Sequence, residues 1–295
     1  MKSVKGIILA GGHGSRLFPL TYGASKQLLP VYDKPMIYYP LSIFMNAGIR
    51  KILIISTKED LPKYKNLFGD GSNLGLKISY AFQKKPRGIA ESFILAEDFI
   101  ADDNVSLILG DNIFHGSSLN QKLDLAKKNL KNKCCTIFGK KVENPHEFGV
   151  IEFDKNGKIL NIKEKPVNPK SKLIVSGLYF YTNDVVEVAN KLTPSSRGEL
   201  EITDINNYYL KQKKLNLVKL GSKISWIDTG TYDSLLKASR YFQQQEKRTK
   251  NKIACIEEVA FKKGFIGKDK LLLAAKSMKN SDYGKYLYKI LKFEN

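Results

Sequence analysis

One stretch near the amino terminus indicates the fold: residues 9–17 read Leu9-Ala10-Gly11-Gly12-His13-Gly14-Ser15-Arg16-Leu17. It continues a short apolar run, Gly6–Ala10, that is typical of a buried strand. Glycines directly after a strand let backbone N–H groups approach phosphate oxygens, because no Cβ stands in the way. The spacing matches neither a Walker loop nor a dinucleotide fingerprint. The stretch predicts a phosphate-binding turn that carries its own cation, Arg16, although a tight turn without a ligand would have a similar composition.

Outward from this turn, short apolar runs alternate with amphipathic stretches through the first half of the chain. This alternation is the pattern of βαβ units, and the runs are short and apolar enough to be strands buried on both faces. We therefore expect an α/β fold with a mostly parallel sheet flanked by helices. The expected strands are Gly6–Ala10, Lys51–Ser56, Lys77–Phe82 and Val105–Leu109, and the expected helices are Pro35–Ala47 and Gly88–Phe99.

After residue 134 the pattern changes. Two strand-like segments, 149–153 and 158–162, flank Asp154-Lys155-Asn156-Gly157, and the Asn-Gly pair is a strong hairpin signal. We expect one α/β domain over residues 1–245 and a helical segment over residues 246–295, packed on the body or on a second subunit. Further expected strands are Ile174–Tyr181, Leu215–Leu220 and Ile224–Ile227, and further expected helices are Asn183–Leu192, Ile202–Lys211 and Thr231–Gln245.

Two aspartates follow apolar runs far apart in the sequence. Asp111 follows Val105–Leu109, and Asp228 follows Ile224–Ile227. Ligands of α/β folds bind at the carboxyl ends of the strands, and Mg²⁺ is usually held by one or two carboxylates together with substrate phosphates. The pair predicts a metal-dependent phosphoryl- or nucleotidyl-transfer site, whereas each aspartate alone could be a helix cap or a turn residue.

Further charged groups fit the same chemistry. Lys26, with Gln27 beside it, lies in a segment bounded by Pro19 and Pro30 and is expected in a loop across the strand ends. Glu164 and Lys165 end another strand, where they suit a sugar hydroxyl and a phosphate, although taken alone they could be a solvated charge run. No catalytic base is expected, because a sugar phosphate is already an anionic nucleophile.

Bulk composition narrows the function classes. No apolar run approaches the roughly 20 residues needed to cross a bilayer, so we expect no membrane partner. The three cysteines lack metal-ligand spacing and suggest free thiols, so we expect a cytoplasmic protein. The formal charge of +20 could indicate a nucleic-acid partner. Because the excess is nearly all lysine spread along the chain, we expect a solvated surface and no nucleic acid.

Taken together, these motifs resemble the sugar nucleotidyltransferases, and within them the glucose-1-phosphate thymidylyltransferases. Agreement extends over most of the chain and is most specific in Gly198-Glu199-Leu200-Glu201-Ile202-Thr203-Asp204. The resemblance implies a Rossmann-like fold with a small sugar-binding β subregion. It also implies Mg²⁺-dependent transfer of dTMP from dTTP to α-D-glucose 1-phosphate, giving dTDP-glucose and pyrophosphate for deoxysugar and dTDP-rhamnose synthesis.

The resemblance also assigns roles to single residues. Arg16, Lys26, Asp111, Lys165 and Asp228 would be catalytic, with Asp111 and Asp228 as metal ligands. It further implies a homotetramer, and a regulatory nucleotide site between subunits that includes Cys255–Lys263. The implied nucleotide contacts are Leu9, Gly11, Gly12, Gly14, Ser15, Arg16, Gln27, Gln83, Gly88 and Asp111; the implied sugar-phosphate contacts are Asn112, Gly149, Glu164, Lys165, Val175 and Tyr179.

Two departures from the family pattern lie near the expected nucleotide site. His13 stands where serine or threonine is usual, and Arg87 stands where aspartate is common before the glycine. Arg87 adjoins the expected base pocket, so a uridylyltransferase that uses UTP is the nearest alternative. A catalytically silent nucleotide-sugar sensor is the alternative from another class.

Overall fold

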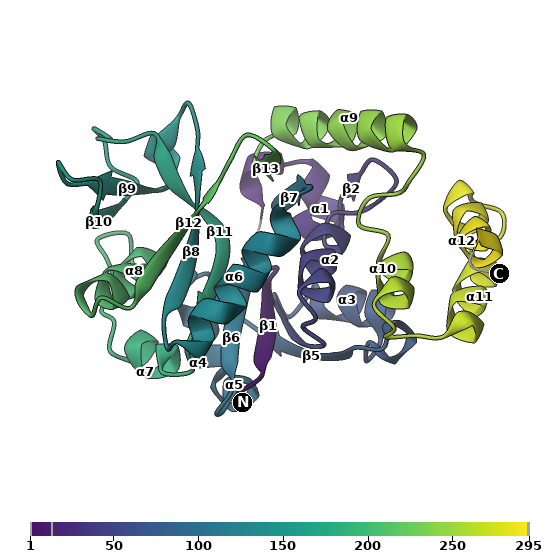
Figure 1. The fold of residues 1–295 in the computed structure, drawn as a ribbon, viewed down its shortest axis with the longest axis horizontal. Coiled ribbons are helices and arrows are strands. Elements are labelled where there is room, and N and C mark those ends of the chain that lie inside the picture. The colour runs from purple at the N-terminus through teal and green to yellow at the C-terminus, as the bar shows by residue number, and fades with distance from the viewer. Residues whose placement is uncertain (1, 13, 294–295) are drawn as a thin grey trace.

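The computed structural model describes residues 2–12 and 14–293; His13, one of the two departures, lies outside the described residues. Within the described part of the chain, nine strands form one sheet in the order β10-β9-β11-β6-β1-β4-β5, with β8 beside β11 and β12 beside β8 (Figure 1). These strands are β1 (Val4–Leu9), β4 (Lys51–Ser56), β5 (Lys77–Phe82), β6 (Asn104–Leu109), β8 (Cys135–Lys141), β9 (Gly149–Phe153), β10 (Ile159–Glu164), β11 (Leu173–Tyr181) and β12 (Leu215–Leu220).

The centre of the sheet is parallel. β1 lies between β4 and β6 and runs parallel to both, and β5 continues the parallel part beyond β4. β11 introduces antiparallel pairs with β6, β8 and β9, and β9 pairs with β10 as the predicted hairpin. The prediction of an α/β fold with a central, mostly parallel sheet is confirmed. Each antiparallel pair of this sheet includes at least one strand that follows residue 134, where the sequence pattern changes.

Helices cover both faces of this sheet because its central strands are apolar on both sides. Ile7 and Ile8 of β1 are fully buried and belong to separate core clusters on opposite faces. The helices are α1 (Leu20–Gly23), α2 (Tyr38–Asn46), α3 (Leu61–Phe68), α4 (Glu91–Leu95), α5 (Glu97–Ile100), α6 (Leu119–Lys131), α7 (Val185–Asn190), α8 (Ile202–Lys211), α9 (Tyr232–Thr249), α10 (Ile256–Lys262), α11 (Lys268–Ser277) and α12 (Asp282–Phe293).

The helix expected over Gly88–Phe99 starts later and is divided in two. Gly88 has φ +99°, and the backbone there hydrogen-bonds to Leu200: Leu200 N donates to Arg87 O at 2.7 Å. A Cβ on Gly88 would lie 2.3 Å from Leu200 O, so only glycine fits at this contact. The glycine that the family resemblance assigns to the base is therefore needed for backbone packing.

Three short helices follow α9. α10 packs on α2 and contacts both α11 and α12, and side chains from all three helices join the core cluster that contains Ile8. In Figure 1, α11 and α12 lie at the end of the molecule farthest from β9 and β10. The division of the chain at residue 245 stays a prediction.

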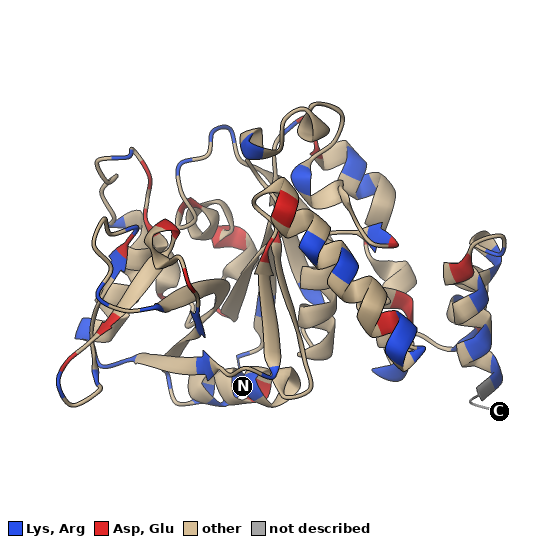
Figure 2. Ribbon diagram, turned by 90° about the horizontal axis from the view of Figure 1, so that it is seen from above, with Lys and Arg blue, Asp and Glu red and all other residues tan. Residues whose placement is uncertain are grey.

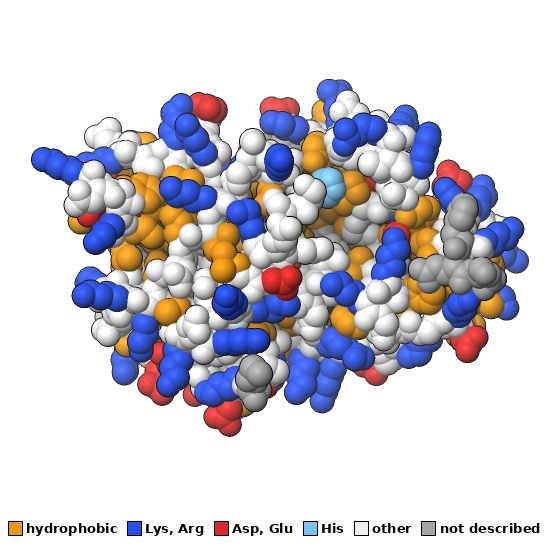
Figure 3. Space-filling view, in the orientation of Figure 1, with side chains coloured by type: hydrophobic (Ala, Val, Ile, Leu, Met, Phe, Trp, Pro, Cys, Tyr) orange, Lys and Arg blue, Asp and Glu red, His pale blue; other side chains and the backbone are white. Residues whose placement is uncertain are grey.

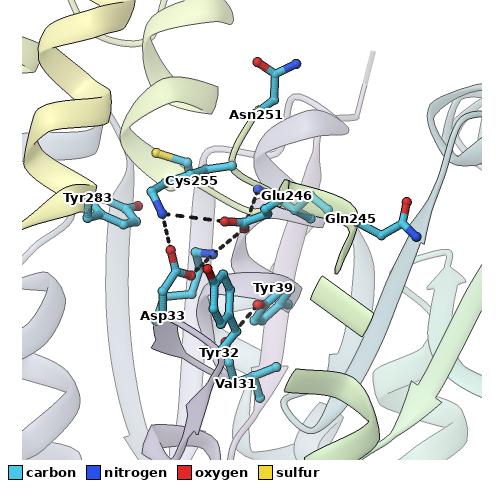
Figure 4. A network of polar contacts seen from close by, with 12 residues as sticks. Val31, Tyr32, Asp33, Tyr39, Gln245, Glu246, Asn251, Cys255 and Tyr283 are labelled. Atoms are coloured by element: carbon cyan, nitrogen blue, oxygen red, sulfur yellow. Dashed lines mark hydrogen bonds and ion pairs between the residues drawn. The ribbon is translucent and has the colours of Figure 1, made fainter. Parts of the chain in front are cut away.

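A buried ionic network joins this region to a small hairpin of β2 (Pro30–Val31) and β3 (Lys34–Pro35). The side chain of Lys34 is 1% exposed; its ammonium group contacts Asp33 and lies 3.0 Å from Glu246 Oε1 near the end of α9. Lys252 contacts the same two carboxylates and lies over the ring of Tyr283 in α12 (Figure 4). The network connects the hairpin, the end of α9 and the last helix.

None of the described helices is long and apolar enough to cross a membrane. Lysine and arginine positions are distributed over many elements and both ends of the molecule (Figure 2).

The network allows a stability prediction. Lys34→Met should lower the free energy of unfolding by about 3 kcal/mol, because two buried carboxylates lose a shared counter-charge. Urea unfolding measures the change, with the exposed Lys155→Met as the control. Equal stability of the two variants would contradict a structural role for the network.

Candidate active site

The site is built on a second, two-stranded sheet of β7 (Asn112–Gly116) and β13 (Ile224–Asp228). The strands are antiparallel, and their register pairs Asp228 with Asn112, the neighbour of Asp111. Thr229 joins the ends of the two strands, since its backbone N and its Oγ1 donate to Asp111 O at 3.2 and 2.9 Å. Strand pairing therefore brings Asp111 and Asp228 together at the carboxyl end of β6.

Asp111 is held by two donors. Lys26 Nζ lies 2.5 Å from its Oδ2, and Asn112 Nδ2 donates to its Oδ1 at 2.9 Å. Burial opposes ionisation, but the ammonium and amide groups outweigh it and hold the pKa of Asp111 below its usual range. Asn112 Oδ1 in turn accepts from Trp226 Nε1 at 2.8 Å. Asn112, expected as a sugar-phosphate contact, has its amide occupied in orienting Asp111.

The pKa of Asp228 is shifted in the opposite direction from that of Asp111. Burial and the negative charge of Asp111 raise its pKa, and the cations Lys26 and Arg16 offset this only in part. Arg16 approaches from the glycine-rich turn: a Cβ on Gly230 would lie 3.1 Å from Arg16 Nη2 and 3.3 Å from Asp228 Oδ1. Glycine at position 230 thus leaves space for this cation beside the carboxylate.

A cavity of about 250 Å³ opens beside these groups and extends to the β9–β10 hairpin. Glu164 Oε2 accepts from Thr203 Oγ1 at 2.5 Å, and burial together with Glu201 raises the pKa of Glu164. Lys165 adopts a left-handed conformation with φ +40°, which is strained for a lysine and typical of functional sites. Of the predicted residues, the cavity is lined by Arg16, Asp111, Asn112, Gly149, Glu164, Lys165, Val175, Tyr179 and Asp228.

The other predicted nucleotide residues lie elsewhere. Gly12 and Gln83 line a separate hollow of about 360 Å³, together with the exposed ring of Phe82. Gln83 Nε2 donates to Glu91 Oε2 at 2.6 Å, and a Cβ on Gly11 would lie 3.0 Å from Gln83 Oε1. The glycine-rich turn therefore borders both spaces, with Gly12 at one and Arg16 at the other. The predicted residues that line neither space are Leu9, Gly11, Gly14, Ser15, Lys26, Gln27 and Gly88.

Gln27 has a structural position. It is buried, its Oε1 accepts from Ser25 Oγ at 2.9 Å, and a Cβ on Gly110 would lie 2.9 Å from its Cγ. The absence of a side chain at Gly110 therefore makes room for Gln27.

Sequence reasoning missed a cation on the sugar side of the cavity. Arg197 Nη2 lies 2.8 Å from Glu201 Oε2, 3.0 Å from Glu199 Oε2 and 3.7 Å from Glu164 Oε1. All four residues line the cavity. Arg197 lies next to Gly198–Asp204, the segment with the most specific family agreement, and that agreement was the available signal for it.

Comparison with known proteins identifies the family of the chain. The family model described as nucleotidyl transferase matches residues 5–245. The chain belongs to the nucleotidyl transferase family. It is 51% identical to the glucose-1-phosphate thymidylyltransferase of Neisseria meningitidis, over 98% of this chain and 100% of that protein. It is 48% identical to the enzyme of the same name from Mycolicibacterium smegmatis, over 98% of this chain and 99% of that one.

Solved structures share the fold of this nucleotidyl transferase. A crystal structure from Bacillus anthracis, assigned as a glucose-1-phosphate thymidylyltransferase, superposes with a TM-score of 0.75 at 39% identity, over 81% of this chain and 95% of that one. A UDP-glucose pyrophosphorylase bound to UDP-glucose has a TM-score of 0.72 at 24% identity, over 83% of this chain and 100% of that one; at this identity the likeness concerns the fold alone.

The raised pKa of Asp228 predicts a stability effect. Because the folded state disfavours the ionised carboxylate, Asp228 lowers the free energy of unfolding at neutral and higher pH. This loss disappears as the pH falls, because the folded chain then takes up a proton. Without divalent cations, Asp228→Asn should raise the free energy of unfolding at pH 8 by about 1 kcal/mol.

Urea unfolding at pH 8 and pH 5 tests this, and the gain should shrink at the lower pH. Asp102→Asn, in an exposed loop, is the matched control and should change stability at neither pH. A less stable Asp228→Asn protein at pH 8 would show that Asp111 does not repel Asp228.

Proposed function

We propose that the chain is a glucose-1-phosphate thymidylyltransferase, which transfers dTMP from dTTP to α-D-glucose 1-phosphate and releases pyrophosphate. The observation that carries the proposal is one cavity in which Asp111 and Asp228 face Arg16 at one end, and Glu164 and Lys165 lie at the other. The near-full-length identity to enzymes of this name supports the choice of substrates.

The carboxylate pair fits a divalent cation. Two acidic oxygen donors lie close enough for the charge of Asp111 to raise the pKa of Asp228, and a cation between them would relieve that repulsion. Among the described residues no group of three or more His, Cys, Asp or Glu side chains could hold a metal ion, which fits a metal completed by substrate phosphates. We assign Mg²⁺ to Asp111 and Asp228; when bound, it would neutralise charge on the phosphate oxygens.

Cations of the chain would act on the leaving group. Arg16 lies beside Asp228 and is more than half exposed, so it can turn toward a triphosphate and neutralise charge that develops on pyrophosphate. Lys26 is buried against Asp111 and would keep that carboxylate ionised. Backbone N–H groups of the glycine-rich turn would orient the phosphates.

The sugar phosphate would occupy the other end of the cavity. Glu164 offers a carboxylate to a sugar hydroxyl, and Lys165 offers positive charge to its phosphate, while Arg197 holds the carboxylates of Glu199 and Glu201 beside them. Val175 and Tyr179 would form the wall against the sugar ring, with Gly149 giving it room. The thymine base would occupy the hollow between Gln83 and Phe82.

Direct displacement is the mechanism this arrangement favours. The phosphate of glucose 1-phosphate is already an anion and would attack the α-phosphorus in line. The chain would then contribute positioning and charge stabilisation. Assembly as a homotetramer remains part of the proposal.

The metal ligands give a direct test. Asp111→Asn and Asp228→Asn should each lower Mg²⁺-dependent turnover by at least about a hundredfold, because each removes a carboxylate that would hold the metal ion beside the transferred phosphate. Pyrophosphate release measures the loss, and Asp102→Asn should keep full activity. Wild-type rates in both variants would refute the metal site.

Nucleotide choice needs a separate assay. Pyrophosphate release should be fastest with dTTP when dTTP, UTP, ATP and GTP are compared against several sugar 1-phosphates. A preference for UTP would identify the uridylyltransferase alternative. Binding without turnover for every pair would identify the sensor alternative.

A further inference from the structure

A cavity of about 590 Å³ in the described part of the chain is remote from the active site. Its walls come from the start of β1 at Val4, the start of β6 at Asn104, the end of α6 at Leu130, and the residues after β11. The active site lies past the other end of β1, beyond Leu9. At roughly 3.3 Å per residue, β1 alone separates the two cavities by about 17 Å.

Lysines dominate the polar lining of this cavity. Five contribute to it, against a single carboxylate, Asp184; they are Lys2, Lys127, Lys131, Lys133 and Lys214. Asp184 is already occupied, since it accepts hydrogen bonds from Thr182 Oγ1 and, at 3.0 Å, from Tyr209 OH. Its neighbours therefore hold Asp184 in place, and one carboxylate stands against five lysines in the lining.

Three of the lysines have no partner of their own within the described part of the chain. Lys2 Nζ donates to Asn183 Oδ1 at 2.9 Å; Lys127 Nζ donates to Ala47 O at 2.8 Å and forms an ion pair with Asp124 Oδ1 at 2.8 Å. No hydrogen bond or ion pair joins the ammonium groups of Lys131, Lys133 and Lys214 to any described residue. They come from two separate places in the sequence, the end of α6 and the turn before β12, and meet at one cavity.

A lysine-rich chain will have solvated lysines on many surfaces, and blue side chains lie over much of the face in Figure 3. The concave shape of the cavity distinguishes its lysines from those on the rest of the surface. Like charges around a hollow with low-dielectric walls reinforce one another's potential, which raises the local concentration of anions. Such convergence is unfavourable for an empty surface and favourable for one that holds an anion.

The remaining walls indicate the kind of anion. Val4 and Leu130 are apolar, and lysine side chains present hydrocarbon stems below their charged ends. The volume falls within the range of cavities that hold small organic ligands, roughly 300–1,000 Å³. A lone inorganic ion would leave the apolar walls without a contact.

We propose that this cavity, which we call the α6 pocket, binds a small organic anion: a phosphate, sulfonate or carboxylate attached to an apolar or aromatic group. Lys131, Lys133 and Lys214 contact the anionic end, and Val4 and Leu130 contact the apolar end. The site is independent of the proposed catalytic chemistry, since it shares no lining residue with the active-site cavity.

The fluorescent anion 8-anilinonaphthalene-1-sulfonate is a suitable probe because it combines a sulfonate with aromatic rings. In the folded full-length protein, the triple variant Lys131→Gln, Lys133→Gln, Lys214→Gln should weaken its binding by about tenfold or more, because three ammonium groups are lost. The matched control is Lys155→Gln, Lys276→Gln, Lys279→Gln, which removes the same charge from exposed positions outside the cavity. It should bind the probe as the wild type does.

Two further measurements decide the nature of the site. Phenyl phosphate should displace the probe and phenol should not, because the anion is what the lysines recognise. Arg16→Gln should leave probe binding unchanged, and the α6-pocket triple variant should keep wild-type pyrophosphate release. Equal binding loss in both triple variants, no loss in either, displacement by phenol, or loss of binding in Arg16→Gln would each overturn the proposal.

Discussion

The antiparallel register of β7 and β13 is the constraint on which the site depends. It sets Asp228 opposite Asn112 and so brings a second carboxylate beside Asp111, against their mutual repulsion. The chain tolerates this because the two aspartates have different surroundings: a buried ammonium group accompanies one, and the other is left with a raised pKa. Strand hydrogen bonds thus hold in place an arrangement that electrostatics alone would separate.

Much of the surrounding polar structure serves to orient that pair before any ligand arrives. Asn112 uses its amide nitrogen on Asp111 and its oxygen on Trp226, so neither end is free to rotate. Thr229 binds the carbonyl of Asp111 from the neighbouring strand. Pre-oriented groups lose little freedom when substrate binds, which is the condition for catalysis by positioning.

Local patterns in the sequence were sufficient for the central strands, the β9–β10 hairpin and both aspartates, because each follows an apolar run or a turn signal of its own. They could not reveal β7, the pairing of β7 with β13, or the contacts of Arg197, which depend on residues distant along the chain. Gly88 and Gly110 show a second limit. A glycine indicates close approach of another group, but the sequence does not tell whether that group is a ligand or, as here, Leu200 and Gln27.

Helix α9 and the ionic network at its end connect the segment after Asp228 with the β2–β3 hairpin. The helix starts four residues after Asp228, is capped by Thr231, and runs 18 residues, or about 27 Å, with Glu246 of the ionic network in its last turn. Lys34 of this network lies in the β2–β3 hairpin, and the hairpin directly follows the segment that carries Lys26. A rigid tilt of α9 would displace Asp228 and Lys26, the two groups that lie beside Asp111. The carboxy-terminal helices, which the ionic network joins to α9, therefore stabilise the position of these groups.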